Sequence, residues 1–161
     1  MLLEEEVPFE QQWGEIMTSP IAPAAKGWSA LVLAGSRPKG DALAAHFGVS
    51  TKALIDFDGQ PMLSRVLAAL HGTAGIERIV VIAQDIEKLE DAVAQGGGAS
   101  LRTSQGGISS SIAELAGSAD LPFPILVTTA DHPLLESALL SGFMEDAGDA
   151  DLAVGMVERA A

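Results

Sequence analysis

Apolar and polar positions alternate in blocks along the chain from Trp28 onward. Short continuous apolar runs that end at turn-forming residues predict strands buried on both faces of a sheet. These runs cover residues 30–34, 53–57, 78–83, 124–129 and 151–157, and a weaker run lies around Leu101. The run 53–57 ends at a predicted turn, Asp58-Gly59. Between them, apolar positions at helical spacing predict helices over residues 62–71, 86–95, 108–116 and 134–147.

This alternation of strands and helices predicts an α/β fold of the three-layer, Rossmann-like type. Right-handed crossovers between parallel strands place helices on both faces of a mostly parallel sheet. In such a sheet, ligands bind in the loops that follow the carboxyl ends of the strands. The loops after residues 34 and 129 are therefore the first candidates for chemistry.

The first 27 residues differ from the rest of the chain. They contain a group of glutamates followed by prolines and alanines, with no sustained strand or helix period. We expect residues 1–27 to form an acidic tail or docking segment and residues 28–161 to form one domain. A chain of 161 residues can build one proper core but is too short for two ordinary domains.

Composition narrows the choice of partners and compartment. A formal net charge of −13 repels nucleic acids and anionic membrane surfaces, so we expect neither as a partner. The absence of Cys excludes disulfides and thiolate zinc sites, and it fits a reducing compartment such as the cytoplasm. No apolar run approaches the roughly 20 residues that span a bilayer. Four of the nine basic residues lie between positions 26 and 52, so a small phosphorylated ligand is compatible with the acidic chain.

The most informative segment is the loop after the first predicted strand, Gly35-Ser36-Arg37-Pro38-Lys39-Gly40. Backbone amides of Ala34, Gly35 and Ser36 can cradle phosphate oxygens, and Arg37 can add a charge-assisted contact. The spacing matches neither the dinucleotide fingerprint nor the P-loop, and no G-x-S-x-G serine elbow occurs in the chain. By residue type alone, Arg37 and Lys52 would more often be solvated surface charges.

A second candidate follows the run 124–129, where Asp131 stands at the predicted sheet edge. A hard cation such as Mg²⁺ prefers one or two carboxylates with phosphate oxygens and water, so Asp131 is a candidate metal ligand. The alternative is that Asp131 caps the helix expected to begin near Pro133. We assign no role to His132, and the three histidines lack zinc-ligand spacing.

A third segment, residues 105–112, enters a predicted helix through Gly106 and Gly107. Its hydrogen-bond donors could face a base or a phosphate of a nucleotide. The alternative is that a serine caps the start of the predicted helix. The loop around residues 83–85 would also border a bound base by chain order, but nothing in it is diagnostic.

Residues 31–63, LVLAGSRPKGDALAAHFGVSTKALIDFDGQPML, resemble the nucleotidyltransferase family that includes molybdenum-cofactor guanylyl- and cytidylyltransferases and sugar-phosphate nucleotidyltransferases. The opening pattern of that family is a strand, L-A-G-G-x-S-x-R, a variable stretch, a Lys and G-x-P-[ML]-[IL]. A later D-x-P-[LF]-[LV] is matched here from Asp131 to Leu135. Compared with the family pattern, this sequence lacks one glycine of the usual pair, and the stretch between Arg37 and Lys52 is long. The resemblance runs from about Trp28 to the end, whereas family members usually continue, so we expect the acceptor-binding C-terminal part to be missing.

The resemblance implies a magnesium-dependent nucleotidyltransferase. Such a protein moves a nucleoside monophosphate from an NTP, here CTP or GTP, to a small phosphorylated or anionic acceptor and releases pyrophosphate. The implied roles are contact of Arg37 and Lys52 with the triphosphate and coordination of Mg²⁺ by Asp131.

For the third segment, the resemblance implies that Gly107, Ser109 and Ser110 help to shape the nucleotide pocket. A noncatalytic nucleotide-binding or assembly module that retains the fold is the alternative function. It would bind NTP without a requirement for Mg²⁺ and would release no pyrophosphate.

Overall fold

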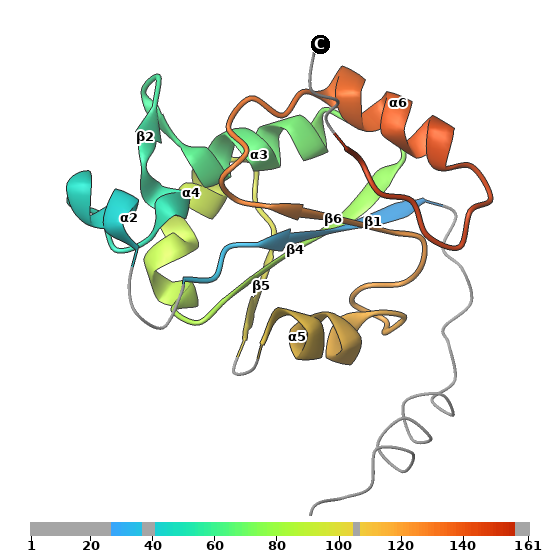
Figure 1. Cartoon of the computed structure of the whole chain (residues 1–161), viewed down its shortest axis with the longest axis horizontal. Helices are drawn as coiled ribbons and strands as arrows, with labels where there is room; N and C mark the ends of the chain where they lie inside the picture. The colour runs from blue at the N-terminus through green and yellow to red at the C-terminus, as the bar shows by residue number, and fades with distance from the viewer. Residues whose placement is uncertain (1–26, 37–40, 105–106, 157–161) are drawn as a thin grey trace, which may run out of the picture.

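The computed structural model describes residues 27–36, 41–104 and 107–156. Its main sheet contains the strands β1 (Trp28–Leu33), β4 (Ile76–Ala83), β5 (Ser100–Thr103) and β6 (Ile125–Thr129). They lie in the order β5-β4-β1-β6, and each neighbouring pair is parallel (Figure 1). The predicted α/β fold with a parallel sheet is confirmed, and so are the strands expected around residues 30–34, 78–83, 101 and 124–129.

The order of the strands reverses direction at β1, and this reversal places helices on both faces. The helices α3 (Met62–His71), α4 (Glu90–Gln95) and α6 (Ser137–Ala147) cover one face of the sheet, and α5 (Ile108–Leu115) covers the other (Figure 1). The chain crosses to the second face between β5 and β6, because β6 lies on the opposite side of β1 from β4. The loops after β1 and β6 therefore flank a topological switch point, the usual place for a ligand.

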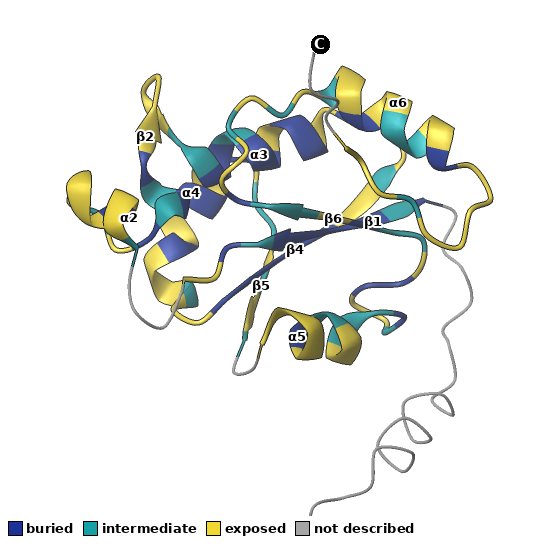
Figure 2. Cartoon of the chain, viewed as in Figure 1, coloured by how far each residue is buried: buried dark blue, intermediate teal, exposed yellow. Residues whose placement is uncertain are grey.

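Alternate residues of β1 supply two cores. Ala30 and Val32 belong to the larger cluster under α3 and α4, whereas Leu31 packs with Val80 and Ile82 on the face that α5 covers. All five are buried, and Figure 2 shows this burial along the centre of the sheet. Burial on both faces explains why the run is apolar at every position.

Residues 53–57 do not form the predicted buried strand. A short 3₁₀ helix, η1 (Lys52–Leu54), comes first, and β2 (Asp56–Phe57) then pairs antiparallel with β3 (Gln60–Pro61). Ala53 and Ile55 are buried, but the backbone bonds locally: the N–H of Ile55 donates to the carbonyl of Lys52 at 3.0 Å. The predicted turn at Asp58 and Gly59 is confirmed, since both have positive φ, 56° and 82°.

The predicted helices are mostly confirmed. The one over 62–71 matches α3, the one over 108–116 ends a residue early, and the one over 86–95 consists of η2 (Ile86–Leu89) and α4. A short helix, α2 (Ala42–His46), was not predicted. The helix expected from residue 134 begins at Ser137, because residues 132–135 form a turn in which the N–H of Leu135 donates to the carbonyl of His132 at 3.0 Å.

The strand predicted over residues 151–157 is wrong within the described part of the chain. Residues 151–156 have no regular structure, and Leu152, Val154 and Met156 are exposed. A strand requires a hydrogen-bonded neighbour, and none of the described strands pairs with this segment. Residues 1–26 lie outside the described residues, so the role of the acidic segment stays a prediction. No helix in the described ranges is long and apolar enough to cross a membrane.

The contact between α3 and α4 depends on Gly96, where a side chain does not fit. An added β-carbon would lie 2.7 Å from Cβ of Leu67 and 2.9 Å from the carbonyl oxygen of Ser64. We predict that Gly96→Ala lowers the free energy of unfolding by about 1–3 kcal/mol, the usual cost of overpacking. The measurement is the midpoint of urea unfolding at equilibrium.

Gly142→Ala is the matched control for this prediction. Gly142 lies in α6, and an added β-carbon meets nothing within 4 Å. We expect a gain of up to about 1 kcal/mol from the better helix propensity of alanine. Equal stability of Gly96→Ala and the unaltered protein would contradict the close packing of α3 against α4.

Candidate functional site

A pocket opens at the carboxyl ends of β1 and β6. It encloses about 880 Å³, including its open mouth, and its lining contains five residues chosen from the sequence: Ala34, Gly35, Ser36, Lys52 and Asp131. These residues come from three separate segments, the loop after β1, η1 and the loop after β6. The fold therefore brings together groups that are far apart in the sequence.

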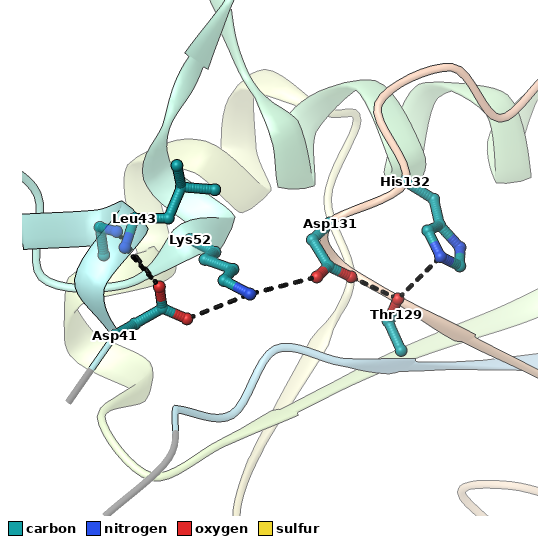
Figure 3. A network of polar contacts seen from close by, with 7 residues as sticks. Asp41, Leu43, Lys52, Thr129, Asp131 and His132 are labelled. Atoms are coloured by element: carbon teal, nitrogen blue, oxygen red, sulfur yellow. Dashed lines mark hydrogen bonds and ion pairs between the residues drawn. The ribbon is translucent and has the colours of Figure 1, made fainter. Parts of the chain in front are cut away.

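Lys52 stands at the centre of a polar network (Figure 3). Its Nζ lies 3.2 Å from Oδ2 of Asp41 and 4.0 Å from Oδ2 of Asp131. The Lys52 side chain is 34% exposed, so an incoming anion can reach its ammonium group. Lys52 and Asp131, to which the resemblance assigned contacts with the triphosphate and its metal ion, therefore lie together in the structure.

Asp131 lies in the turn after β6 and is held by its neighbour. The hydroxyl of Thr129 donates to Oδ1 of Asp131 at 2.6 Å, and Nε2 of His132 lies 3.4 Å from the same hydroxyl oxygen (Figure 3). Asp131 does not cap a helix, because the N-cap position of α6 is Glu136. The capping alternative for Asp131 is therefore wrong, and its Oδ2 points toward Lys52.

Asp41 is a site residue that the sequence analysis missed. Its Oδ1 accepts hydrogen bonds from the backbone N–H groups of Leu43 at 2.9 Å and Ala44 at 3.3 Å, which makes it the N-cap of α2. Burial raises the pKa of its carboxyl, but the hydrogen bonds from Lys52, Ala44 and Leu43 outweigh burial, so the pKa lies below the usual value. An aspartate before a short run of alanine and leucine was the available signal, since it is a preferred cap.

Gln84, in the loop after β4, fixes the loop after β1. Its Oε1 accepts a hydrogen bond from the backbone N–H of Ser36 at 2.9 Å. The N–H of Ala34 donates to the carbonyl of Ile82 at 2.9 Å, as part of the sheet. Two of the backbone donors expected to cradle phosphate are therefore already engaged, and a phosphate at Ser36 would have to displace the Gln84 amide.

A second depression adjoins the first along this loop. It measures about 560 Å³, including its open mouth, and shares Ala34, Ser36, Thr51 and Gln84 with the larger pocket. Chain order had placed the loop containing Gln84 near the site, but its residue types carried no diagnostic pattern. Its place in the lining of both depressions and its contact with Ser36 identify Gln84 as part of the site.

The glycine and serine segment lies beside the pocket. Gly107 is the N-cap position of α5, and the next residue, Ile108, lines the pocket. Ser109 and Ser110 are exposed in the first turn of α5 and are not part of the lining. Because the N-cap is glycine and has no side-chain hydrogen bond, the alternative of a serine cap is wrong. Arg37 lies outside the described residues.

The pocket offers a divalent cation a single well-exposed carboxylate. In the described ranges, no three His, Cys, Asp or Glu side chains are grouped to hold a metal. The Asp131 side chain is 41% exposed, whereas that of Asp41 is 16% exposed and already caps α2. Mg²⁺ is often held by one or two carboxylates together with substrate phosphates. The residues therefore fit a cation that arrives with a phosphorylated ligand.

Comparison with known proteins gives a family match over most of the chain. Residues 30–160 match the family described as the MobA-like NTP transferase domain. A search of curated proteins found no match. The match covers β1 from Ala30 onward, the pocket and α6, so it includes every described residue of the candidate site.

Several solved structures share the fold. One is a nucleotidyl transferase from Methanothermobacter thermautotroptrophicus, with a TM-score of 0.60 and 21% identity over 75% of this chain and 58% of that one. A 4-diphosphocytidyl-2C-methyl-D-erythritol synthase gives 0.54 and 19%, over 80% and 57%. A CMP:2-keto-3-deoxy-manno-octonic acid synthetase complexed with CTP gives 0.56 and 15%, over 77% and 48%. The chain thus spans between 48% and 58% of the length of these structures.

The Asp41 carboxylate should make the stability of the domain depend on pH. Because folding lowers its pKa, the ionised group stabilises the fold above an unfolded value of about 3.9, and this contribution is lost as pH falls through the folded value. Asp41→Asn removes the charge but retains a good cap. We expect the variant to be less stable near pH 7 and the difference to shrink below about pH 4. Thermal melts across this range test this, and a difference that does not vary with pH would contradict it.

Proposed function

Because this chain belongs to the family of MobA-like NTP transferase domains, we propose that it binds a nucleoside triphosphate and transfers the nucleoside monophosphate to a small anionic acceptor. The observation that carries the proposal is the approach of Lys52 to Asp131, 4.0 Å apart at the carboxyl edge of β1 and β6. A cation and an acid at this position suit a phosphate chain bridged by a metal ion.

The charges in the pocket support a requirement for a divalent cation. The described lining contains one cationic side chain, Lys52, and two carboxylates, Asp41 and Asp131. A triphosphate would meet net negative charge there, in a chain whose total is −13. We propose that Asp131 would hold Mg²⁺ together with the triphosphate, and that the ion would supply positive charge against the phosphate oxygens.

Contacts with the phosphates come from the loop after β1 and from α5. Gly35 and Ser36 supply backbone N–H groups, with Gln84 giving way at Ser36. Arg37, outside the described residues, would add a bidentate contact. The amino end of α5, beginning at Gly107, adjoins the pocket through Ile108, and such helix ends favour phosphate.

The remaining parts of the nucleotide have candidate positions beside these contacts. We propose the smaller depression between Ser36, Thr51 and Gln84 for the nucleoside. Ser109 and Ser110, exposed in the first turn of α5 just outside the lining, would help to shape the nucleotide pocket beside Ile108. CTP and GTP are the nucleotides proposed, and a synthetase of the same fold was solved as a complex with CTP.

The reaction needs positioned charge and no covalent nucleophile. An oxygen of the acceptor attacks the α-phosphorus, the bond to the oxygen that bridges α and β breaks, and pyrophosphate leaves. Lys52 and Arg37 would neutralise the charge that develops on the departing pyrophosphate. Positioning and electrostatic stabilisation are the main sources of rate in transfers of this kind.

The proposal is tested by thermal shift with each of the four NTPs, with and without Mg²⁺. A ligand at about 100 times its Kd stabilises the folded state by about 2.7 kcal/mol, which corresponds to several degrees in Tm. We expect CTP or GTP to give such a shift only when Mg²⁺ is present. Release of pyrophosphate on addition of anionic acceptors is the second readout.

Variants locate the binding site. We expect Lys52→Ala and Asp131→Ala each to abolish the part of the shift that depends on Mg²⁺. Arg102→Ala is the matched control, because Arg102 forms an exposed ion pair with Asp120 at 2.9 Å and lines neither depression. An unchanged shift in both site variants would overturn the site. NTP binding that is insensitive to Mg²⁺ and releases no pyrophosphate would favour the noncatalytic module.

A further inference from the structure

Lys52 lies between two carboxylates that differ in distance, exposure and anchoring. Asp41 is nearer at 3.2 Å and its side chain is 16% exposed, whereas Asp131 is at 4.0 Å and 41% exposed. Asp41 is also fixed by two backbone hydrogen bonds from the first turn of α2, through the oxygen that does not face Lys52. Asp41 is therefore the more rigid partner of the two.

We propose that Asp41 is a positioning residue that keeps the Lys52 ammonium group away from Asp131, and so leaves the Asp131 carboxylate available to a phosphate-bound cation. The inference rests on the proposed function, because it concerns the residues that would meet the triphosphate and its metal ion. The inference gives Asp41 an indirect role in that function, because Asp41 itself contacts Lys52 and the first turn of α2.

The physical argument is competition for Asp131. A lysine ammonium is a compact charge on a flexible stem of four carbons, so it moves to the nearest anion that is free to accept it. Without the Asp41 charge, Asp131 is the remaining carboxylate within 4.0 Å of Lys52 Nζ among the residues that the structure describes. A Lys52–Asp131 ion pair would then occupy the oxygen that a divalent cation needs.

Simple charge repulsion predicts the opposite result. Removing the negative charge of Asp41 leaves the pocket less acidic, which by itself would strengthen the binding of NTP with Mg²⁺. Positioning predicts instead that more Mg²⁺ is required. A higher Mg²⁺ requirement therefore excludes simple repulsion of the triphosphate, and the acetylation rate of Lys52 separates positioning from the lost attraction of Asp41 for the cation.

Two substitutions separate the roles of Asp41. In Asp41→Asn, an amide oxygen can still accept the backbone hydrogen bonds that cap α2, but the ion pair to Lys52 is lost. In Asp41→Ala, both the cap and the ion pair are lost. If Asp41 served only to cap α2, the Mg²⁺ requirement would change in the Ala variant and hardly at all in the Asn variant. Positioning predicts that both variants require more Mg²⁺.

The experiment measures the Mg²⁺ concentration that gives half of the NTP-induced rise in Tm. We expect this concentration to increase about two- to fivefold in Asp41→Asn, a factor typical of the loss of a partly exposed ion pair. Asp41→Ala should show at least the same increase and a lower Tm without nucleotide. Asp120→Asn, which breaks the exposed ion pair to Arg102, is the control and should leave the midpoint unchanged. An unchanged or lower midpoint in Asp41→Asn would overturn the proposal.

A second measurement does not depend on nucleotide binding. The rate at which acetic anhydride acetylates Lys52, followed by mass spectrometry of the peptide, reports how firmly its ammonium group is held. We expect faster acetylation in Asp41→Asn than in Asp131→Asn, with Lys88, paired to Asp85 at 2.8 Å, as the internal reference. If Lys52 is acetylated faster in Asp41→Asn but the protein binds no NTP, the proposed function is refuted. The inference that Asp41 holds the ammonium group of Lys52 would then still stand. Normal NTP binding with both readouts unaffected by Asp41→Asn would refute only the positioning role.

Discussion

The parallel pairing of β1 with a neighbour on each side is the constraint on which the rest of the structure depends. Its residues bond to β4 on one edge and to β6 on the other, and its side chains are divided between two cores. Since the helices that cross over on the two sides must lie on opposite faces, the loops after β1 and β6 separate at their shared edge. The pocket with Lys52 and Asp131 occupies that separation.

The site is held in place by a small number of polar contacts. Lys52 is held by Asp41, Asp131 is held by the hydroxyl of Thr129, and Ser36 is held by Gln84. Each contact fixes a group that would otherwise have to be ordered when a ligand binds, and ordering side chains costs free energy. A preformed network of this kind suits a reaction accelerated by positioning and charge.

The proposed phosphorylated ligand is compatible with the net charge of −13. The excess of acidic residues repels polyanions at long range, but this repulsion is screened beyond a Debye length of about 8 Å in physiological salt. Under the proposed function, local charges in the pocket and a divalent cation would then govern binding, which favours a small nucleotide over a long polyanion.

The sequence by itself determined the strands and helices whose burial pattern is repeated along the chain. The buried strand at β1, the helix at α3 and the turn at Asp58 and Gly59 were all predicted. They could be predicted because the order of apolar, polar and turn-forming residue types specifies local conformation and burial. Lys52 and Asp131 were also chosen from the sequence. The family pattern singled out both residues, and Asp131 also follows the apolar run 124–129; the structure places both in the pocket, whereas their roles stay predictions.

Only the tertiary structure decided which groups meet. The run 53–57 has the composition of a buried strand, yet it forms η1 and a short hairpin, since its burial is against α3 and no strand of the main sheet pairs with it. Residues 151–156 are apolar but unpaired in the described chain, so composition alone could not make them a strand. Asp41 and Gln84 were missed as site residues because their roles depend on hydrogen bonds to Lys52 and Ser36, which lie close only after folding. Residue type specifies local conformation and burial, whereas contacts between distant segments are fixed by the packing of the whole sheet and its helices.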